Sequence, residues 1–207
     1  MSISMWLAFL TASVVVSLSP GAGAVNTMNS GINYGLRYSV STVLGLQLGY
    51  AAQILVVAVG LGALLASSTV AFSFIKWAGV AYLMWLGVQK WNTRTSWDVI
   101  ECRKESSKKL FWKSTLINLT NPKATVFLVA LLPQFLSNSS YSYLLQLLVL
   151  GTTLLVVDLI VMFCYAALAS QFKVFITSGA RMKVMNRIFG ASFILAAIAL
   201  SSYNKNS

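Results

Sequence analysis

The sequence predicts an all-α membrane protein in which six transmembrane helices form two inverted three-helix repeats, with prolines breaking the first and fourth helices. Composition, the spacing of apolar segments and the positions of two prolines lead to this prediction. Of the 207 residues, 57% are hydrophobic and 9% are charged, and the mean hydropathy is +0.77. A soluble domain of this size would need more polar residues to cover its surface. The chain is therefore expected to be embedded in a membrane.

Six apolar segments are long enough to cross a bilayer, since a helix of about 20 residues spans about 30 Å of hydrocarbon. They lie near residues 4 to 26, 38 to 66, 71 to 90, 113 to 135, 143 to 170 and 186 to 203. No polar stretch between them is long enough to fold as a separate soluble domain. We therefore expect one transmembrane domain over residues 1–207, with repeats of about 1–92 and 110–203 joined by a basic loop.

The first apolar segment has a second interpretation, as a cleaved signal peptide. Residues 5 to 18 are apolar, and Ala22-Gly23-Ala24 resembles a small-residue cleavage site. A signal peptide begins with a positively charged region, however, and the first basic residue of this chain is Arg37. The segment also has a counterpart later in the chain, so we interpret it as a transmembrane helix.

Basic residues predict the orientation. Most of the 15 Lys and Arg lie between the third and fourth segments or between the fifth and sixth, and Arg37 precedes the second. These three connections fall on one side of the membrane, which the positive-inside rule identifies as the cytoplasm, with both termini outside. The net charge of +11 follows from this topology. We therefore expect contact with anionic membrane lipid and no nucleic-acid partner.

Two prolines interrupt apolar segments at corresponding positions, in Ser19-Pro20-Gly21 and in Asn121-Pro122-Lys123. A proline inside a helix removes a backbone hydrogen bond, and in hydrocarbon the freed polar groups must be satisfied by protein or by a water-filled cavity. Matching breaks in two halves of a membrane protein indicate the binding site of a secondary transporter. We therefore expect a transport site where the two breaks meet.

An internal repeat supports this symmetry. Residues 76 to 83 and 187 to 194 share the pattern basic, x, x, Gly, small, small, aromatic, aliphatic at a shift of 111 positions. The same shift places Gln47 opposite Asp158, whereas Pro20 and Pro122 are 102 positions apart. The second half therefore needs nine extra residues, which the connection at 133 to 143 can hold. Three helices per repeat make the second repeat inverted.

Asp158 is the candidate for proton coupling. It is the only acidic residue outside the predicted cytoplasmic loops. Its insertion into hydrocarbon costs at least about 2.5 kcal/mol, so a function or a charged partner is expected. Lys123 falls at a similar depth and is the expected partner. An Asp158–Lys123 pair that only fixes helix packing remains an alternative.

The polar residues around the breaks are the candidates for substrate binding. Backbone amides freed near a proline suit a substrate carboxylate, and freed carbonyls and amide side chains suit an ammonium or hydroxyl group. A small zwitterion meets both requirements. Local satisfaction of backbone groups remains the alternative for each residue. The candidates are Ser19, Pro20, Gly21, Asn26, Gln47, Asn121, Pro122 and Lys123.

Other features indicate packing or exclude chemistry. The pairs Gly31/Gly35 and Gly45/Gly49 place small residues on one helix face, which favours close helix packing. The chain has no His, and Cys102 and Cys164 form no Cys-x-x-Cys pair. We therefore expect no catalytic residue, metal site or cofactor, and no enzyme activity. A membrane thiol-disulfide carrier and a structural membrane protein remain as alternative functions.

Five motifs occur in an order and spacing that resemble the lysine exporter superfamily, above all its resistance-to-homoserine/threonine branch, from residue 5 to about residue 200. The motifs are Ser-Leu-Ser-Pro-Gly-Ala-Gly-Ala-Val-Asn at 17–26, Gly45-Leu46-Gln47, Lys76-Trp77-Ala78-Gly79 with Tyr82-Leu83 and Gly87, Asn118-Leu119-Thr120-Asn121-Pro122-Lys123, and Pro133-Gln134-Phe135.

This resemblance implies a six-helix exporter of the bacterial inner membrane that expels homoserine, its lactone and threonine in exchange for protons. Ala22 stands where many superfamily members have a second proline. Export of other amino acids, whether basic, cysteine-like or leucine-like, therefore remains an alternative. The absence of an acidic cluster in the apolar segments favours a neutral zwitterion over a dibasic cargo. The oligomeric state stays open, with a homo-oligomer as one outcome.

Overall fold

A computed structural model describes residues 2–67, 69–92, 105–136 and 142–171, and ten positions between 184 and 201. Every regular element in these ranges is helical, as the sequence predicts. The connections at 93–104 and 137–141, with Asp98, Glu101 and Cys102, lie outside the described residues. So do residues 172–183 and the end of the chain, which leaves the predicted sixth segment described only at separate positions.

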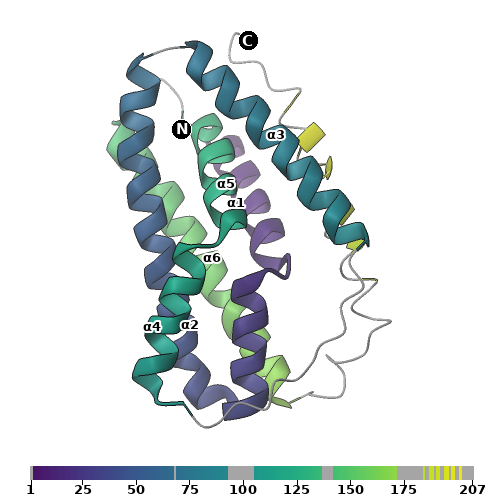
Figure 1. Ribbon diagram of the computed structural model, residues 1–207. Coiled ribbons are helices and arrows are strands. Elements are labelled where there is room, and N and C mark those ends of the chain that lie inside the picture. The colour runs from purple at the N-terminus through teal and green to yellow at the C-terminus, as the bar shows by residue number, and fades with distance from the viewer. Residues whose placement is uncertain are drawn as a thin grey trace.

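The first broken helix consists of α1 (Ile3–Leu18) and the beginning of α2 (Ala22–Ser67). The Ser2 hydroxyl caps α1 by accepting a hydrogen bond from the Met5 amide. Within α2 the chain turns back at Gly35, whose φ of 76° and ψ of 173° are not helical. Figure 1 shows α1 and residues 22–34 running downward, and residues 36–67 returning upward. The first segment is therefore longer than the predicted 4 to 26 and ends at residue 34.

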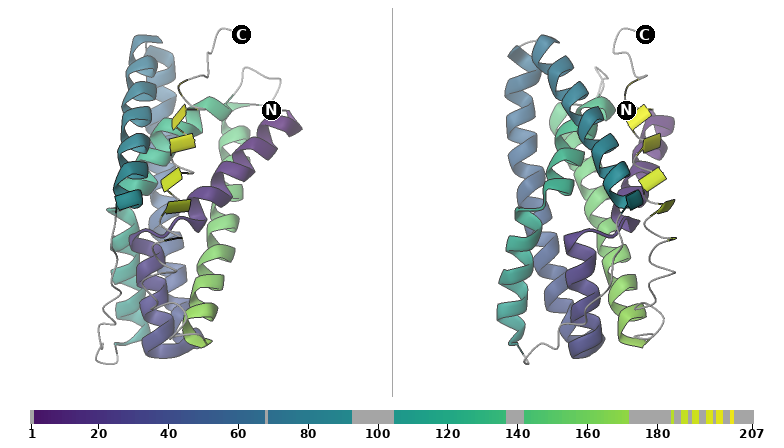
Figure 2. Two further views of the ribbon diagram at one scale, coloured as in Figure 1. Left: turned by 90° about the vertical axis from the view of Figure 1, so that its right-hand side faces the viewer. Right: turned by 45° about the vertical axis from the view of Figure 1, so that its right-hand side comes forward.

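The remaining elements are α3 (Thr69–Asn92), α4 (Ser107–Leu119), α5 (Pro122–Leu131), the 3-10 helix η1 (Leu132–Phe135) and α6 (Tyr143–Gln171). The pair α4 and α5 is the second broken helix, bent by 48° at its break. It runs upward in Figure 1, opposite to α1, whereas α6 runs downward, opposite to residues 36–67 of α2. Corresponding elements of the two halves thus run in opposite directions in all three views (Figure 2).

Among the described residues, two helical stretches, Ala22–Gly60 and Tyr143–Gln171, are long and apolar enough to cross a membrane, and the bent pair from Ser107 to Phe135 adds a third if it counts as one span. The helix α1 is apolar but shorter. Large apolar side chains lie on the outer surface, such as Val56, which is 71% exposed. A bilayer accommodates such a surface, which water does not.

Glycines decide how closely α2 packs against its neighbours. A Cβ on Gly49 would lie 2.5 Å from the Thr115 carbonyl oxygen of α4, and one on Gly45 would overlap the Phe111 carbonyl. A Cβ on Gly31 would lie 2.6 Å from the Ala166 carbonyl oxygen of α6. The packing interpretation is confirmed for these three glycines. It is wrong for Gly35, which has open space around it and serves instead as the turn, because only glycine adopts its positive φ without strain.

Candidate functional site

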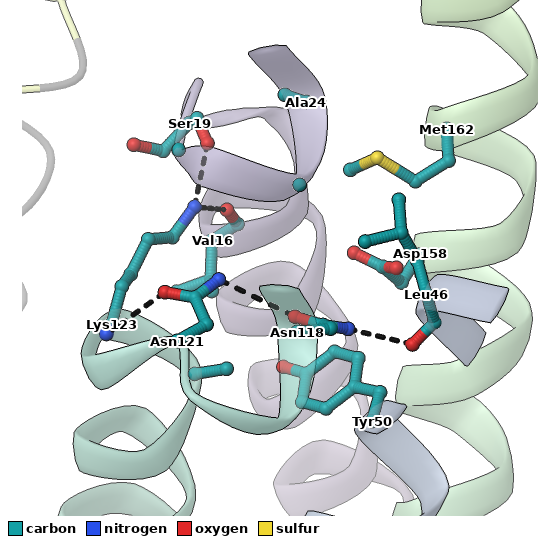
Figure 3. Close-up of a pocket in the computed structure, with 13 residues that line it drawn as sticks. Val16, Ser19, Ala24, Leu46, Tyr50, Asn118, Asn121, Lys123, Asp158 and Met162 are labelled. Carbon is teal, nitrogen blue, oxygen red and sulfur yellow. Dashed lines mark hydrogen bonds between the residues drawn. The ribbon is translucent and has the colours of Figure 1, made fainter. Parts of the chain in front are cut away.

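A small cavity lies where the two helix breaks approach each other (Figure 3). Its volume is about 30 Å³, close to that of one water molecule. Residues from α1, α2, α4, α5 and α6 contribute to it, so both halves of the chain build the site. The lining consists of Val16, Ser19, Gly21, Gly23, Ala24, Leu46, Tyr50, Asn118, Asn121, Lys123, Ala124, Asp158 and Met162.

The second break is stabilised by its own side chains. Asn121 is the N-cap of α5, and its Oδ1 accepts a hydrogen bond of 3.1 Å from the Lys123 backbone amide. Pro122 occupies the first turn, where no amide donor is needed. The Asn121 amide donates to the Asn118 carbonyl oxygen at 2.9 Å, and Asn118 Nδ2 donates to the Leu46 carbonyl of α2 at 2.7 Å. Asparagines thus satisfy this break and attach it to α2.

The first break is completed by a side chain from the second. Pro20 has no amide proton to donate to the Val16 carbonyl four residues earlier, and α1 ends at this point. The Val16 carbonyl oxygen accepts from the Ser19 backbone amide at 3.2 Å and from Lys123 Nζ at 2.8 Å, and Lys123 Nζ also donates to the Ser19 carbonyl. These carbonyls belong to the C-terminal end of a helix, where the partial charge is negative and a cation is favoured. Figure 3 shows the Lys123 side chain reaching across to both oxygens.

Asp158 enters the cavity from the opposite side (Figure 3). It is 7% exposed, and its Oδ2 accepts a hydrogen bond of 2.8 Å from Gln47 Nε2. The sequence repeat pairs these two residues across the halves, and residues related by a two-fold axis meet where that axis passes between them. The partner expected for Asp158 was Lys123. Both charges line the cavity, but the hydrogen bonds described for each lead to other groups.

Two polar atoms around the cavity have no hydrogen-bond partner within the described part of the chain. They are Ser19 Oγ and Gln47 Oε1, and each is fully enclosed. Ser19 is only 1% exposed. A buried hydroxyl without a partner is costly, and such atoms commonly mark a place that water or a ligand occupies.

The structure brings together five of the residues predicted from the sequence: Ser19, Gly21, Asn121, Lys123 and Asp158 all line the cavity. Pro20 and Pro122 form the two breaks without lining it, and Gln47 contacts it only through Asp158. Asn26 lies elsewhere and donates a hydrogen bond of 2.8 Å to Ser114 Oγ at the contact between α2 and α4. The assigned roles of all these residues in binding or coupling stay predictions.

Sequence reasoning missed several residues of the lining, among them Tyr50, Asn118 and Met162. Two of these had a signal in the chain. Tyr50 lies three positions after Gln47, which places both on one helix face, and Asn118 opens the motif that ends at Lys123. No sequence pattern pointed to Met162, because a methionine at helical spacing is typical of any apolar core.

Other reactive groups lie away from the cavity. Glu105, before α4, pairs with Lys109 at 2.9 Å and with Lys113 at 3.4 Å. The hydrogen bond from Lys109, assisted by the Lys113 charge, holds the pKa of Glu105 below its ordinary value. Cys164 is exposed on α6. Within the described ranges, no three His, Cys, Asp or Glu residues are grouped so that they could hold a metal ion.

A chain whose described elements are all helical, with broken apolar helices that meet at a cavity lined by charged and polar side chains among apolar ones, has the architecture of a membrane transporter. The sequence matches the LysE type translocator family over residues 14–204. The chain belongs to this family.

Full-length relatives are known. An uncharacterized membrane protein of Vibrio cholerae is 47% identical over 203 residues, which cover 98% of each chain. The homoserine/homoserine lactone efflux protein of Salmonella typhimurium is 44% identical with the same coverage. A leucine efflux protein of an Enterobacter species is 26% identical and covers 94% of this chain and 93% of its own. No solved structure matches the chain.

Proposed function

We propose that the protein is a secondary active exporter of small neutral amino acids, chiefly homoserine and homoserine lactone and also threonine. The observation that carries this proposal is the cavity between the breaks, which Lys123 and Asp158 line with opposite charges. A zwitterion offers the complementary charges at short separation. The 44% identity to a homoserine/homoserine lactone efflux protein over nearly the full length of both chains supports these cargoes.

The proposed topology has six membrane spans in two inverted repeats, in the bacterial inner membrane with both termini outside. The opposite directions of the two broken helices support it (Figure 1). So does the contact between Gln47 and Asp158, the pair that the repeat predicts to correspond. In inverted-repeat transporters the substrate binds between the repeats near the membrane midplane, and one repeat moves against the other to change access.

Proton exchange follows from competition at Asp158. The carboxylate attracts the substrate's ammonium group when it is charged and loses that attraction when it is protonated. A proton entering from outside would therefore release the amino acid, and loss of the proton to the cytoplasm would restore the binding site. The cavity of about 30 Å³ is too small for an amino acid. The breaks must therefore move apart on loading, as alternating access requires.

Amino-acid release from intact cells tests the cargo. Cells with and without the protein are loaded with homoserine, threonine, leucine and lysine, and internal and external amounts are followed over time. Expression should raise external homoserine and homoserine lactone most, and threonine less. Preferential release of lysine or leucine would assign the protein to another cargo and contradict the proposal.

The double variant Cys102→Ser with Cys164→Ser is the matched control. Transport through the cavity needs no thiol, so this variant should export homoserine as the unmodified protein does. Loss of function at an equal membrane level would instead support a thiol-disulfide carrier. A protein of purely structural function would produce no substrate-dependent counterflow in proteoliposomes.

A further inference from the structure

We propose that Lys123 determines substrate specificity. Its ammonium group lies in the position that the ammonium group of a bound substrate would take. The Lys123 ammonium occupies a cation site formed by the Val16 and Ser19 carbonyls. An incoming substrate places its own α-ammonium there, across the cavity from the Asp158 carboxylate that attracts it, and Lys123 turns to bind the substrate's carboxylate. The inference rests on the proposed function and assigns the two ends of the substrate to particular groups.

The cation site is built from backbone at the end of α1. Pro20 withholds the amide that a continuous helix would offer to the Val16 carbonyl, and the helix dipole adds partial negative charge at this end. The Ser19 hydroxyl, buried and without a hydrogen-bond partner among the described residues, lies on the same turn. An ammonium group has three donors, and Lys123 donates to both carbonyls. A substrate ammonium would find the same acceptors.

Lys123 has room to leave this site. Its backbone is fixed by Asn121 and Pro122 at the start of α5, whereas its side chain is a flexible chain of four carbons. The side chain passes over Gly21, where an added Cβ would lie 3.3 Å from Lys123 Cδ and 3.6 Å from Nζ. Glycine at this position therefore leaves the space in which the lysine lies. When the lysine turns away, that volume joins the small cavity.

The two proposed cargoes differ at the group that Lys123 would bind. Homoserine and homoserine lactone both carry an α-ammonium group, but the carboxylate of homoserine is an uncharged ester in the lactone. Asp158 and the α1 carbonyls can serve both molecules. A lysine that binds the carboxylate serves only homoserine. The Lys123 charge should therefore set the preference between them, because a charge-assisted hydrogen bond is about twice as strong as a neutral one.

Counterflow in proteoliposomes tests the assignment. The unmodified protein, Lys123→Gln and Lys123→Arg are reconstituted at equal amounts, and the uptake of labelled homoserine and labelled lactone is measured within minutes at mildly acidic pH, which keeps the lactone closed. Lys123→Gln should shift the homoserine-to-lactone ratio toward the lactone by about tenfold, the factor that corresponds to one lost charged hydrogen bond. Lys123→Arg keeps the positive charge and should keep the ratio.

An equal fall of both fluxes in Lys123→Gln would overturn the inference and leave Lys123 as a structural cap of α1. An unchanged ratio at full activity would overturn it too. If the unmodified protein carries neither compound, the proposed function itself fails, which is a separate result.

If the Lys123→Gln variant does not insert into the membrane, an inhibition experiment on the unmodified protein tests the same inference. 3-Aminopropan-1-ol is homoserine without its carboxylate, and 4-hydroxybutanoate is homoserine without its amino group. The amine should inhibit lactone counterflow by occupying the cation site, and the acid should not. Inhibition by the acid alone would contradict the proposed order of binding.

Discussion

The breaks at Ser19-Pro20-Gly21 and Asn121-Pro122-Lys123 occupy corresponding places in the two halves of the chain, yet their polar groups are satisfied in different ways. The second break is self-contained, because Asn121 caps α5 and bonds to the preceding turn. At the first break, Lys123 from the second break donates a hydrogen bond to the Ser19 carbonyl, and the Ser19 hydroxyl has no partner among the described residues. The correspondence of the two breaks in sequence is thus not a correspondence in chemistry. The second break supplies the cap of α5 and the charge of Lys123, and the first break presents carbonyl oxygens as acceptors.

The largest effect is expected from Asp158→Asn. Asparagine keeps the size of the side chain and an acceptor for Gln47, but it carries neither charge nor proton at physiological pH. Homoserine resistance and uphill export in a pH gradient should fall to the level of cells without the protein. The measurement is growth on added homoserine together with proton-driven flux in proteoliposomes.

Glu105→Gln is the matched control, since it removes an acidic group that lies outside the cavity. It should leave export unchanged. Normal proton-driven export by Asp158→Asn at an equal membrane level would remove the coupling role and leave the cavity with Lys123 as its one functional charge among the described residues.

A smaller effect is expected from Gly49→Ala, which tests whether α2 holds the second break in place. The added methyl group would collide with the Thr115 carbonyl oxygen on α4, two turns before Asn121. Overpacking of this kind costs about 1–3 kcal/mol. The thermal unfolding temperature in detergent should fall. Gly60→Ala, at a glycine with no atom within 4 Å of the added methyl group, should not lower it. Equal behaviour of the two variants would contradict the packing.

The smallest effects are expected from Asn121→Ala and Ser19→Ala, which compare the two breaks directly. Asn121→Ala removes the cap of α5 and should destabilise the protein by about 1 kcal/mol. Ser19→Ala removes a hydroxyl that has no hydrogen-bond partner among the described residues and should leave the unfolding temperature unchanged while it lowers the affinity for substrate. Paired measurements of thermal unfolding and of the half-saturating homoserine concentration check both results. A larger loss of stability at Ser19 would reverse the comparison.

Much of the site could be predicted from the chain because prolines and intramembrane charges are rare and costly there. Ser19, Gly21, Asn121, Lys123 and Asp158 were found in this way, and all five line the cavity. Asn26 does not line the cavity, because its place near the break in sequence says nothing about which helix face it occupies, and its role in substrate binding stays a prediction. Its amide bonds to Ser114 instead.

The sequence by itself determined the helical class, the two breaks and the correspondence of Gln47 with Asp158 at a shift of 111 positions, because apolar run length, proline and internal repetition are local or linear properties. That these two residues are hydrogen-bonded to each other came only from the structure. The tertiary structure alone decided that Gly35 is a turn and that Lys123 completes the end of α1. The hydrogen bond between Lys123 and Val16 joins residues more than a hundred positions apart, and its geometry depends on how closely the glycines let the helices approach. The periodicity of the sequence carries no information on the distance between helices. Only the packed structure could therefore show which groups hold the charges of Lys123 and Asp158.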